Sequence, residues 1–216
     1  MSARYSQSYW VGLFVALNLL STVTSAAPEI SAASAIPVVP AKPVDPIKLV
    51  EQAEKALDQE DLVAAMKLYY QAAEQNYLPA QVRMGQFAES SQFYEESVGW
   101  YLMAATQGSA EGQANLGRMY MTGNGIEKDD NKALYWVRRA AAQDYLPAVR
   151  VMAVSYKVGG FSGKIKPDLD QEKLWNAKVS RLEAIARRAA DEKLAELAAS
   201  AKKLKEDEAA KRANKK

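Results

Sequence analysis

The 216-residue sequence contains no cysteine and no histidine. Without histidine, a Ser-His-Asp triad, an imidazole general base and the usual zinc sites are excluded. Without cysteine, thiol catalysis, disulfide bonds and thiolate metal sites are excluded too. Carboxylate-pair and Ser-Lys chemistry remain open, but no spacing in the chain singles out either. The composition predicts a protein that is not an enzyme and needs no cofactor or metal.

The chain also lacks a large excess of either charge, because the net charge is only +2. A balanced charge gives no reason to expect nucleic acid or an acidic polymer as a partner. Alanine is abundant and β-branched residues are sparse, so helix is the expected secondary structure. The length allows one sizeable core.

Residues 1–27 read as a secretory signal peptide. Arg4 supplies a positive n-region, Trp10–Leu20 forms an apolar core, and small residues allow cleavage after Ala26 or Ala27. The apolar run is shorter than the ~20 residues of a comfortable transmembrane helix. We expect export, with the periplasm as the location. An uncleaved inner-membrane anchor and secretion are the alternatives.

The composition changes between residues 28 and 46. This stretch, "PEISAASAIPVVPAKPVDP", holds five of the eight prolines. Such a segment favours an extended tether and cannot pack a core. We therefore assign residues 28–45 to a linker and expect the folded part to begin near Pro46.

A Tyr-Leu-Pro-Ala phrase occurs twice, in "NYLPAQVRMG" (76–85) and in "DYLPAVRVMA" (144–153). A third and more divergent copy, "ESVGWYLMAATQGSAEGQANLG", lies between them. Superposing the three copies gives spacings of 32 and 36 residues. This is the period of stacked helix-pair arrays.

The phrase has the composition of a hinge between two helices. Asn76, Gly108 and Asp144 fall where one helix must stop, in a left-handed conformation. Pro79 and Pro147 stand at the start of the next helix, where a missing N–H costs nothing.

Small residues and aromatic residues also coincide in the three copies. The small residues are expected to let two helices approach closely; they are Ala80, Gly112, Ala148, Gly85, Gly117 and Ala153. The aromatic residues are expected to fill the space between helix pairs; they are Tyr69, Trp100, Tyr101, Trp136, Tyr120 and Tyr156. If its indole is buried, Trp136→Ala should cost ~3–5 kcal/mol of stability.

The best-preserved unit runs from Ala110 to Tyr145 and closely resembles the Sel-one-like repeat (SLR), a relative of the tetratricopeptide repeat. The matching residues are Leu116, Gly117, Tyr120, Gly123, Gly125, Asp129, Lys132, Ala133, Trp136, Ala140 and Ala141. The flanking units are degenerate, so the resemblance covers about residues 60–180. It implies an all-α fold, a tetratricopeptide-like α-solenoid of antiparallel helix pairs.

We expect three to four helix pairs between residues 46 and 180, with the first helix covering the exposed end. Asp168 is predicted to cap a long C-terminal helix, with Gln171 at the third helical position, and the helix runs to about Lys211. Five residues are expected to pack back on the last repeat: Trp175, Val179, Leu182, Ile185 and Ala189.

Residues 181–216 are assigned to a charged helical tail. Past Asp191 its apolar residues become fewer and form a narrow heptad-like stripe of Leu194, Leu197, Ala201 and Leu204. Two interpretations stay open: a solvated helix, and a functional helix that either docks on a partner or self-associates as a weak coiled coil.

Two glycine-rich loops are candidate sites. Gly123–Gly125 follows a helix and lacks the residues of a phosphate loop, so we interpret it as a tight turn. Val158–Pro167 lengthens the last repeat, and its three glycines predict a mobile loop. A binding face and neutral drift are both open for it.

In related helix-pair repeats, ligands lie against the first helix of each pair. Carried over by position, the contacts would be Val82, Gln86, Glu89, Ala114, Arg118, Met121, Arg150, Val154 and Lys157. Arg118, Arg150 and Lys157 would form a basic strip suited to a carboxylate or an acidic peptide, with Gln86 and Met121 beside it. The alternative is an ordinary solvated surface. We expect Arg118→Ala to leave the melting temperature almost unchanged.

The resemblance implies a non-enzymatic scaffold or adaptor of the bacterial cell envelope that binds a protein partner through its concave face. Membrane contact is expected only if the N-terminal segment is retained. One alternative is a protein that binds or acts on cell-wall polymer, using acid groups such as Glu89, Glu95 or Glu96. A membrane-tethered spacer is the other.

Overall fold

The computed structural model describes residues 44–213, with side chains as far as Lys203 and again at Glu206. The predicted signal peptide and nearly all of the linker lie outside these residues. The described stretch forms eight helices, and none of them is both long and apolar enough to cross a membrane. They are α2 (Pro46–Asp58), α3 (Leu62–Glu74), α4 (Leu78–Ser90), α5 (Tyr94–Thr106), α6 (Ala110–Thr122), α7 (Asp130–Ala142), α8 (Leu146–Val158) and α9 (Leu169–Ala213).

The first seven of these helices have the same length, 13 residues. From α2 to α6 they begin at regular intervals, at positions 46, 62, 78, 94 and 110. The sum of two such intervals equals the shorter of the two repeat spacings found in the sequence, 32 residues. The second spacing is longer because α6 ends at Thr122 and α7 begins only at Asp130. The longer period is therefore a longer loop and not a longer helix.

Five of the helices end in the same way. At the end of α2, the N–H of Asp61 donates to the carbonyl of Ala56, and the N–H of Glu60 donates to Leu57. This is the Schellman pattern, which requires a left-handed residue after the helix. Helices α3, α4, α5 and α7 end with the same bond across five residues. In these helices the accepting carbonyls belong to Ala72, Ala88, Ala104 and Ala140.

The left-handed residues predicted from the sequence are confirmed. Asn76, Gly108 and Asp144 have φ of 61°, 97° and 60°. Glu60 and Gln92 adopt the same conformation, with φ of 61° and 64°. Neither residue type is typical of such a turn, so sequence reasoning did not predict these two. The hydrogen bonds and packing of the repeat impose the conformation there.

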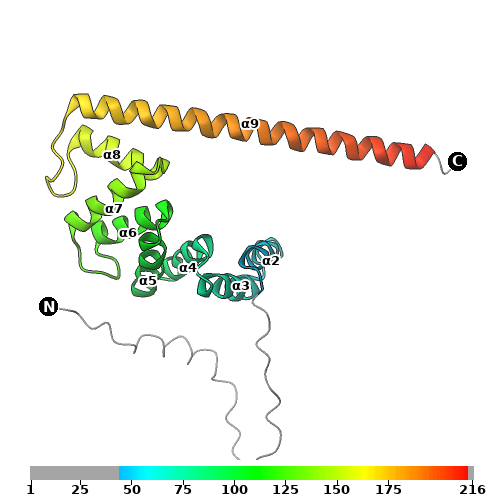
Figure 1. Cartoon of the computed structure of the whole chain (residues 1–216), viewed down its shortest axis with the longest axis horizontal. Helices are drawn as coiled ribbons and strands as arrows, with labels where there is room; N and C mark the ends of the chain where they lie inside the picture. The colour runs from blue at the N-terminus through cyan, green and yellow to red at the C-terminus, as the bar shows by residue number, and fades with distance from the viewer. Residues whose placement is uncertain (1–43, 214–216) are drawn as a thin grey trace, which may run out of the picture. The chain divides into compact units, whose positions relative to one another are not determined.

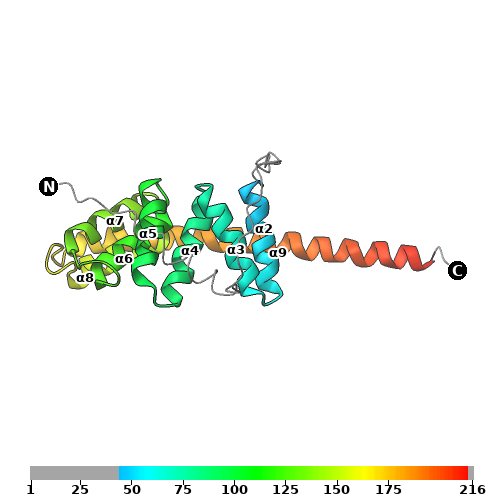
Figure 2. The same cartoon turned by 90° about the horizontal axis from the view of Figure 1, so that it is seen from below.

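Consecutive helices pack as antiparallel pairs, α2 with α3, α4 with α5, α6 with α7 and α8 with α9. We call α2, α4, α6 and α8 the A helices and their partners the B helices. The pairs stack into a curved array, with the A helices toward its inner side (Figures 1 and 2). This confirms the all-α solenoid of antiparallel helix pairs, and the long C-terminal helix is itself the second member of the last pair.

Glycines set the distance between the two helices of a pair, as the sequence predicted. A Cβ on Gly85 would lie 2.5 Å from the ring of Tyr101, which is completely buried. A Cβ on Gly117 would lie 2.8 Å from Val137. The B-helix side chain fills the space that the missing methyl group leaves, so neither glycine accepts a larger residue without separating its helices.

Buried glutamines tie each pair to the one before it. Gln81 in α4 donates to the carbonyl of Ala73, and Gln113 in α6 donates to the carbonyl of Ala105. Both side chains are fully buried. Each spans from an A helix to the last turn of the preceding B helix, where the bond stabilises the stacking.

The last pair makes this link with another residue. Val149 stands in α8 where the glutamine would be and cannot donate a hydrogen bond. Lys178 of α9 instead donates to the carbonyl of Ala141 over 2.8 Å and pairs with Asp144 over 2.7 Å. Lys178 thus replaces the hydrogen bond of the missing glutamine, and it does so from α9 instead of α8.

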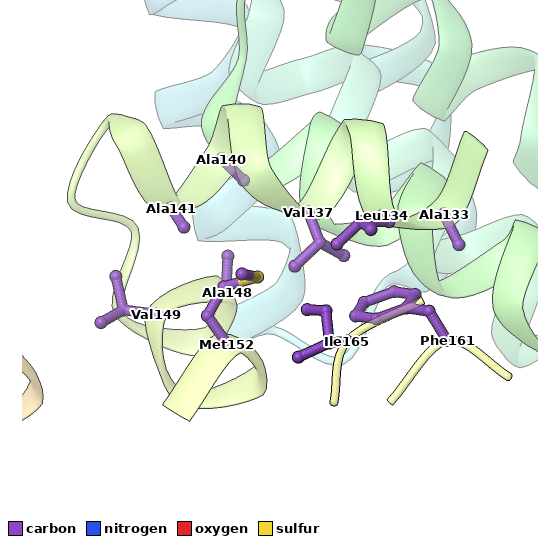
Figure 3. Packing of buried hydrophobic residues seen from close by; sticks show 10 residues of the cluster. All are labelled: Ala133, Leu134, Val137, Ala140, Ala141, Ala148, Val149, Met152, Phe161 and Ile165. Carbon is purple, nitrogen blue, oxygen red and sulfur yellow. The ribbon is translucent and has the colours of Figure 1, made fainter. Parts of the chain in front are cut away.

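The lengthened loop after α8 belongs to the core. Gly160 and Ile165 form an antiparallel bridge, and the side chains of Phe161 and Ile165 are 5% and 3% exposed. Figure 3 shows both beneath α7, beside residues of α8. The prediction of a mobile loop is therefore corrected, because two apolar anchors hold it.

The Gly123–Gly125 loop is a structural turn, as interpreted. Gly123 ends α6 with φ of 81°, and its N–H donates to Met119. A Cβ on Gly125 would lie 2.2 Å from the backbone of Tyr94. Close backbone contact therefore explains this second glycine.

The long helix α9 begins as predicted, with Asp168 accepting hydrogen bonds from the N–H groups of Asp170 and Gln171. Trp175, Val179 and Leu182 pack against the α7–α8 core. The packing stops there. Ile185 is 53% exposed and Ala189 is also exposed, so those two predicted contacts are wrong.

Trp100 is the buried indole of the array, with 6% exposure, whereas Trp136 is only partly buried. We expect Trp100→Ala to cost about 3–5 kcal/mol of unfolding free energy, because it leaves a large cavity beside Tyr69 and Met84. Trp136→Ala should cost clearly less, contrary to the prediction made for it from sequence. Urea denaturation of both variants checks this, and equal losses would contradict the burial difference.

Candidate functional site

The inner side of the array carries the residues predicted to bind a ligand. Gln86, Arg118 and Met121 are half-buried there, and Arg150 and Lys157 are exposed. Val82, one of the other positions carried over from related repeats, is only 5% exposed and packs in the core.

Arg118 is engaged by a neighbouring helix. Both of its terminal nitrogens donate to Glu89 of α4, each over 2.6 Å. The buried Tyr101 of α5 donates its hydroxyl to the same carboxylate over 3.0 Å. Three helices from two pairs meet in this cluster. The bidentate geometry is that of a strong, oriented ion pair.

The charges of the cluster support one another. Hydrogen bonds from Arg118 lower the pKa of Glu89 below its ordinary value, with a smaller contribution from Tyr101. The same bonds raise the pKa of Arg118. Burial, reinforced by the nearby carboxylate, raises the pKa of Tyr101. At neutral pH the carboxylate is charged and the phenol keeps its proton.

A related network joins the preceding pairs. Tyr69 donates its hydroxyl to Glu54, which also lies 3.5 Å from Arg83. Arg83 donates to Gln86 over 3.1 Å, and Gln86 donates to Glu111 over 2.8 Å. The network runs from α2 to α6 and ties three A helices together.

Arg150 is paired as well. It donates to Glu183 of α9 over 2.8 Å. The two side chains are 56% and 40% exposed, so this contact lies at the surface and is worth little. It nevertheless occupies the guanidinium that the sequence assigned to a ligand.

The structure therefore does not present the three cations as a strip with free charges. Arg118 and Arg150 each have an acidic partner within the chain. Spacing along one helix could not show these partners, because Glu89 and Glu183 are 29 and 33 residues away in the sequence.

A different group of side chains is open at the end of the inner side. On α8, Val154 and Val158 are 58% and 67% exposed, with the exposed Lys157 beside them in the sequence. We call Val154, Lys157 and Val158 the α8 surface. Sequence reasoning included Val154 and Lys157 and missed Val158. A search for exposed apolar residues four apart would have found it.

The site offers little for catalysis. A general acid needs a carboxyl group of raised pKa, whereas the pKa of Glu89 is lowered. Among the side chains that the structure describes, no group of three or more histidine, cysteine, aspartate or glutamate residues could hold a metal ion.

Comparison with known proteins agrees with the fold. The Sel1 repeat model matches residues 55–77, 79–109 and 110–145. The chain contains three Sel1 repeats. Its α8–α9 pair lies beyond the matched repeats. Sel1 repeat proteins typically act as non-catalytic scaffolds for protein–protein interaction.

Two solved structures resemble the chain. A Sel1 repeat protein from Oxalobacter formigenes is 29% identical, with a TM-score of 0.58 over 63% of this chain and 58% of that one. A protective antigen of uropathogenic Escherichia coli strains that displays an SLR fold is 28% identical, with a TM-score of 0.58 over 63% of this chain and 30% of that one. The chain thus spans less than two thirds of the length of either relative. No curated protein matches it.

The cluster predicts that Arg118→Ala destabilises the array by roughly 1–2 kcal/mol, because it leaves Glu89 half-buried without its partner. Sequence reasoning predicted almost no change. Urea denaturation at pH 7 separates the two expectations. Lys173→Ala, which removes an exposed pair with Asp170, is the control.

The same pair should make stability depend on pH. The pKa of Glu89 is lower in the folded chain than the ~4.3 of an unfolded chain. Its contribution is therefore complete above that unfolded value and is lost as the pH falls through the folded one. The deficit of Glu89→Gln against wild type should be clear at pH 7 and shrink at pH 3. A deficit equal at both pH values would rule out the ionised pair as its cause.

Proposed function

We propose that this Sel1 repeat protein is a non-enzymatic scaffold of the bacterial cell envelope, exported to the periplasm, where it binds a protein partner. The repeat family supports the scaffold role. The signal-like residues 1–27 support export. Both solved relatives named above come from bacteria, which suits an envelope location.

The observation that carries the binding role is the α8 surface. Val154 and Val158 leave most of their area in water and lie one turn apart on α8. Exposed apolar residues beside a charged one are typical of a contact site. Met121 of α6, another predicted ligand contact, is partly buried and packs against the α7–α8 core.

The partner chemistry follows from these side chains. We infer a segment with small apolar side chains for the two valines and a carboxylate for Lys157. Arg118 and Gln86 act in this proposal as internal ties that hold the inner side in shape. Arg150 can contact the partner only if its ion pair with Glu183 breaks.

Crosslinking in intact cells tests the surface. A photo-reactive residue at Val154 should capture a specific protein, and Val158→Glu or Lys157→Glu should abolish the capture. Val63 of α3, which is 80% exposed, provides the matched control position, and Val63→Glu should change nothing. Capture that is equal from both positions, or that survives both α8 changes, would refute the surface. If cell-wall fragments co-purify in place of a protein, the polymer-binding alternative replaces the scaffold.

The N-terminus tests export. We expect the protein purified from the envelope to begin at residue 27 or 28, because the small residues allow cleavage after Ala26 or Ala27. Mass spectrometry of the intact protein measures this directly. An intact residue 1 in the membrane fraction would favour the membrane-tethered spacer, and an intact chain in the soluble cytoplasmic fraction would refute export.

A further inference from the structure

Helix α5 contains a glycine that the packing of the array does not require. Four glycines lie inside helices of the described chain: Gly85, Gly99, Gly112 and Gly117. A Cβ on three of them would lie 2.5–2.8 Å from a neighbouring helix, whereas a Cβ on Gly99 would meet nothing within 4 Å. A helical glycine in this array therefore marks close contact with another helix, and at Gly99 the chain itself supplies none.

The repeat does not explain this glycine either. Gly99 is the sixth residue of α5, and the sixth residues of α3 and α7 are Lys67 and Tyr135, which are both exposed. The position thus accepts a large side chain elsewhere in the array. Glycine is among the poorest helix formers, so α5 gives up stability at an exposed position with no packing gain inside the chain.

Gly99 belongs to an exposed stripe of α5. Glu95, Gly99, Leu102 and Thr106 are spaced four, three and four residues apart, which places them on one face of the helix. All four are exposed, and Leu102 leaves 41% of its area in water. We call these four residues the α5 face. Helices α4 and α6 pack against other sides of α5, which lies near the middle of the array (Figure 1).

The charge of the α5 face is negative. Within the part of the chain that the structure describes, Glu95 takes part in no ion pair. Helix α5 contains no lysine or arginine, and Glu96 adds a second carboxylate beside the first. Acidic residues in a first turn also suit the helix dipole, but the dipole does not account for the glycine or for the exposed leucine. A partner that covers this face has to bring the cation.

We propose that the α5 face docks a helix of a partner protein, which crosses α5 at Gly99. This helix carries small or apolar side chains at the crossing and a lysine or arginine opposite Glu95. The missing Cβ lets the two helices approach closely, as α4 and α5 do at Gly85. Leu102 supplies apolar contact area one turn further along α5. A second copy of α5 does not fit, because it offers no cation.

The stability of Gly99→Ala tests whether the chain itself needs the glycine. We expect the melting temperature to rise by about 2–4 °C, because alanine favours the helix and its Cβ meets no neighbour. Gly117→Ala is the matched control and should melt below the wild type, because its Cβ would lie 2.8 Å from Val137. Thermal unfolding followed by circular dichroism measures both. A Gly99→Ala variant that melts below the wild type would overturn the proposal.

Photo-crosslinking in intact cells tests the docking. A photo-reactive residue in place of Thr106 should capture one protein, and mass spectrometry should place the crosslink in a segment of helical periodicity that contains lysine or arginine. Gly99→Leu should reduce this capture at least tenfold without lowering the melting temperature, and Glu95→Lys should act in the same way. A photo-reactive residue in place of Lys67, which holds the corresponding position on α3, is the control and should not capture the protein.

The outcomes separate this inference from the proposed function, because the α5 face and the α8 surface lie on different helices. Capture that survives Gly99→Leu, a captured segment without a basic residue, or no specific capture from Thr106 would each overturn the α5 face. Capture from Val154 should stay unchanged in Gly99→Leu, so it reports on the α8 surface alone.

Discussion

The array depends on how its helices stop. Five of them end in a Schellman turn, with a left-handed residue and a long bond back to an alanine carbonyl. This turn ends those five helices after the same number of residues and joins each of them to the next helix through an equally short connection. Equal lengths bring the same faces together in every pair, so a glycine such as Gly85 meets a large B-helix side chain such as Tyr101.

The close spacing has an electrostatic consequence on the inner side. Neighbouring A helices lie within reach of each other's long side chains. Arg118 therefore pairs with Glu89, and Gln86 bridges Arg83 and Glu111. These ties hold the curvature in place and remove the free cations that a basic groove would need. What remains open on this side is the α8 surface.

The C-terminal end departs from the repeat, and its two exposed surfaces follow from that departure. Beyond α8 the loop is longer, Val149 replaces the linking glutamine, and no turn stops α9 at the length of the other helices. Two residues compensate for these changes. Phe161 of the loop packs into the core, and Lys178 of α9 donates to the carbonyl of Ala141. The helix then continues into solvent, with its packing face uncovered.

The sequence by itself determined the period, the all-α class, the hinges at Asn76 and Asp144 and the start of α9 at Asp168, because these depend on local conformational preferences. Tertiary structure alone decided which indole is buried, that Phe161 anchors its loop, and that Arg118 has a partner. Burial and ion pairing depend on residues that are far apart in the chain, and spacing along one helix carries no information about them. The left-handed Glu60 and Gln92 belong to the same group, since neighbouring helices impose a conformation that their side chains do not favour.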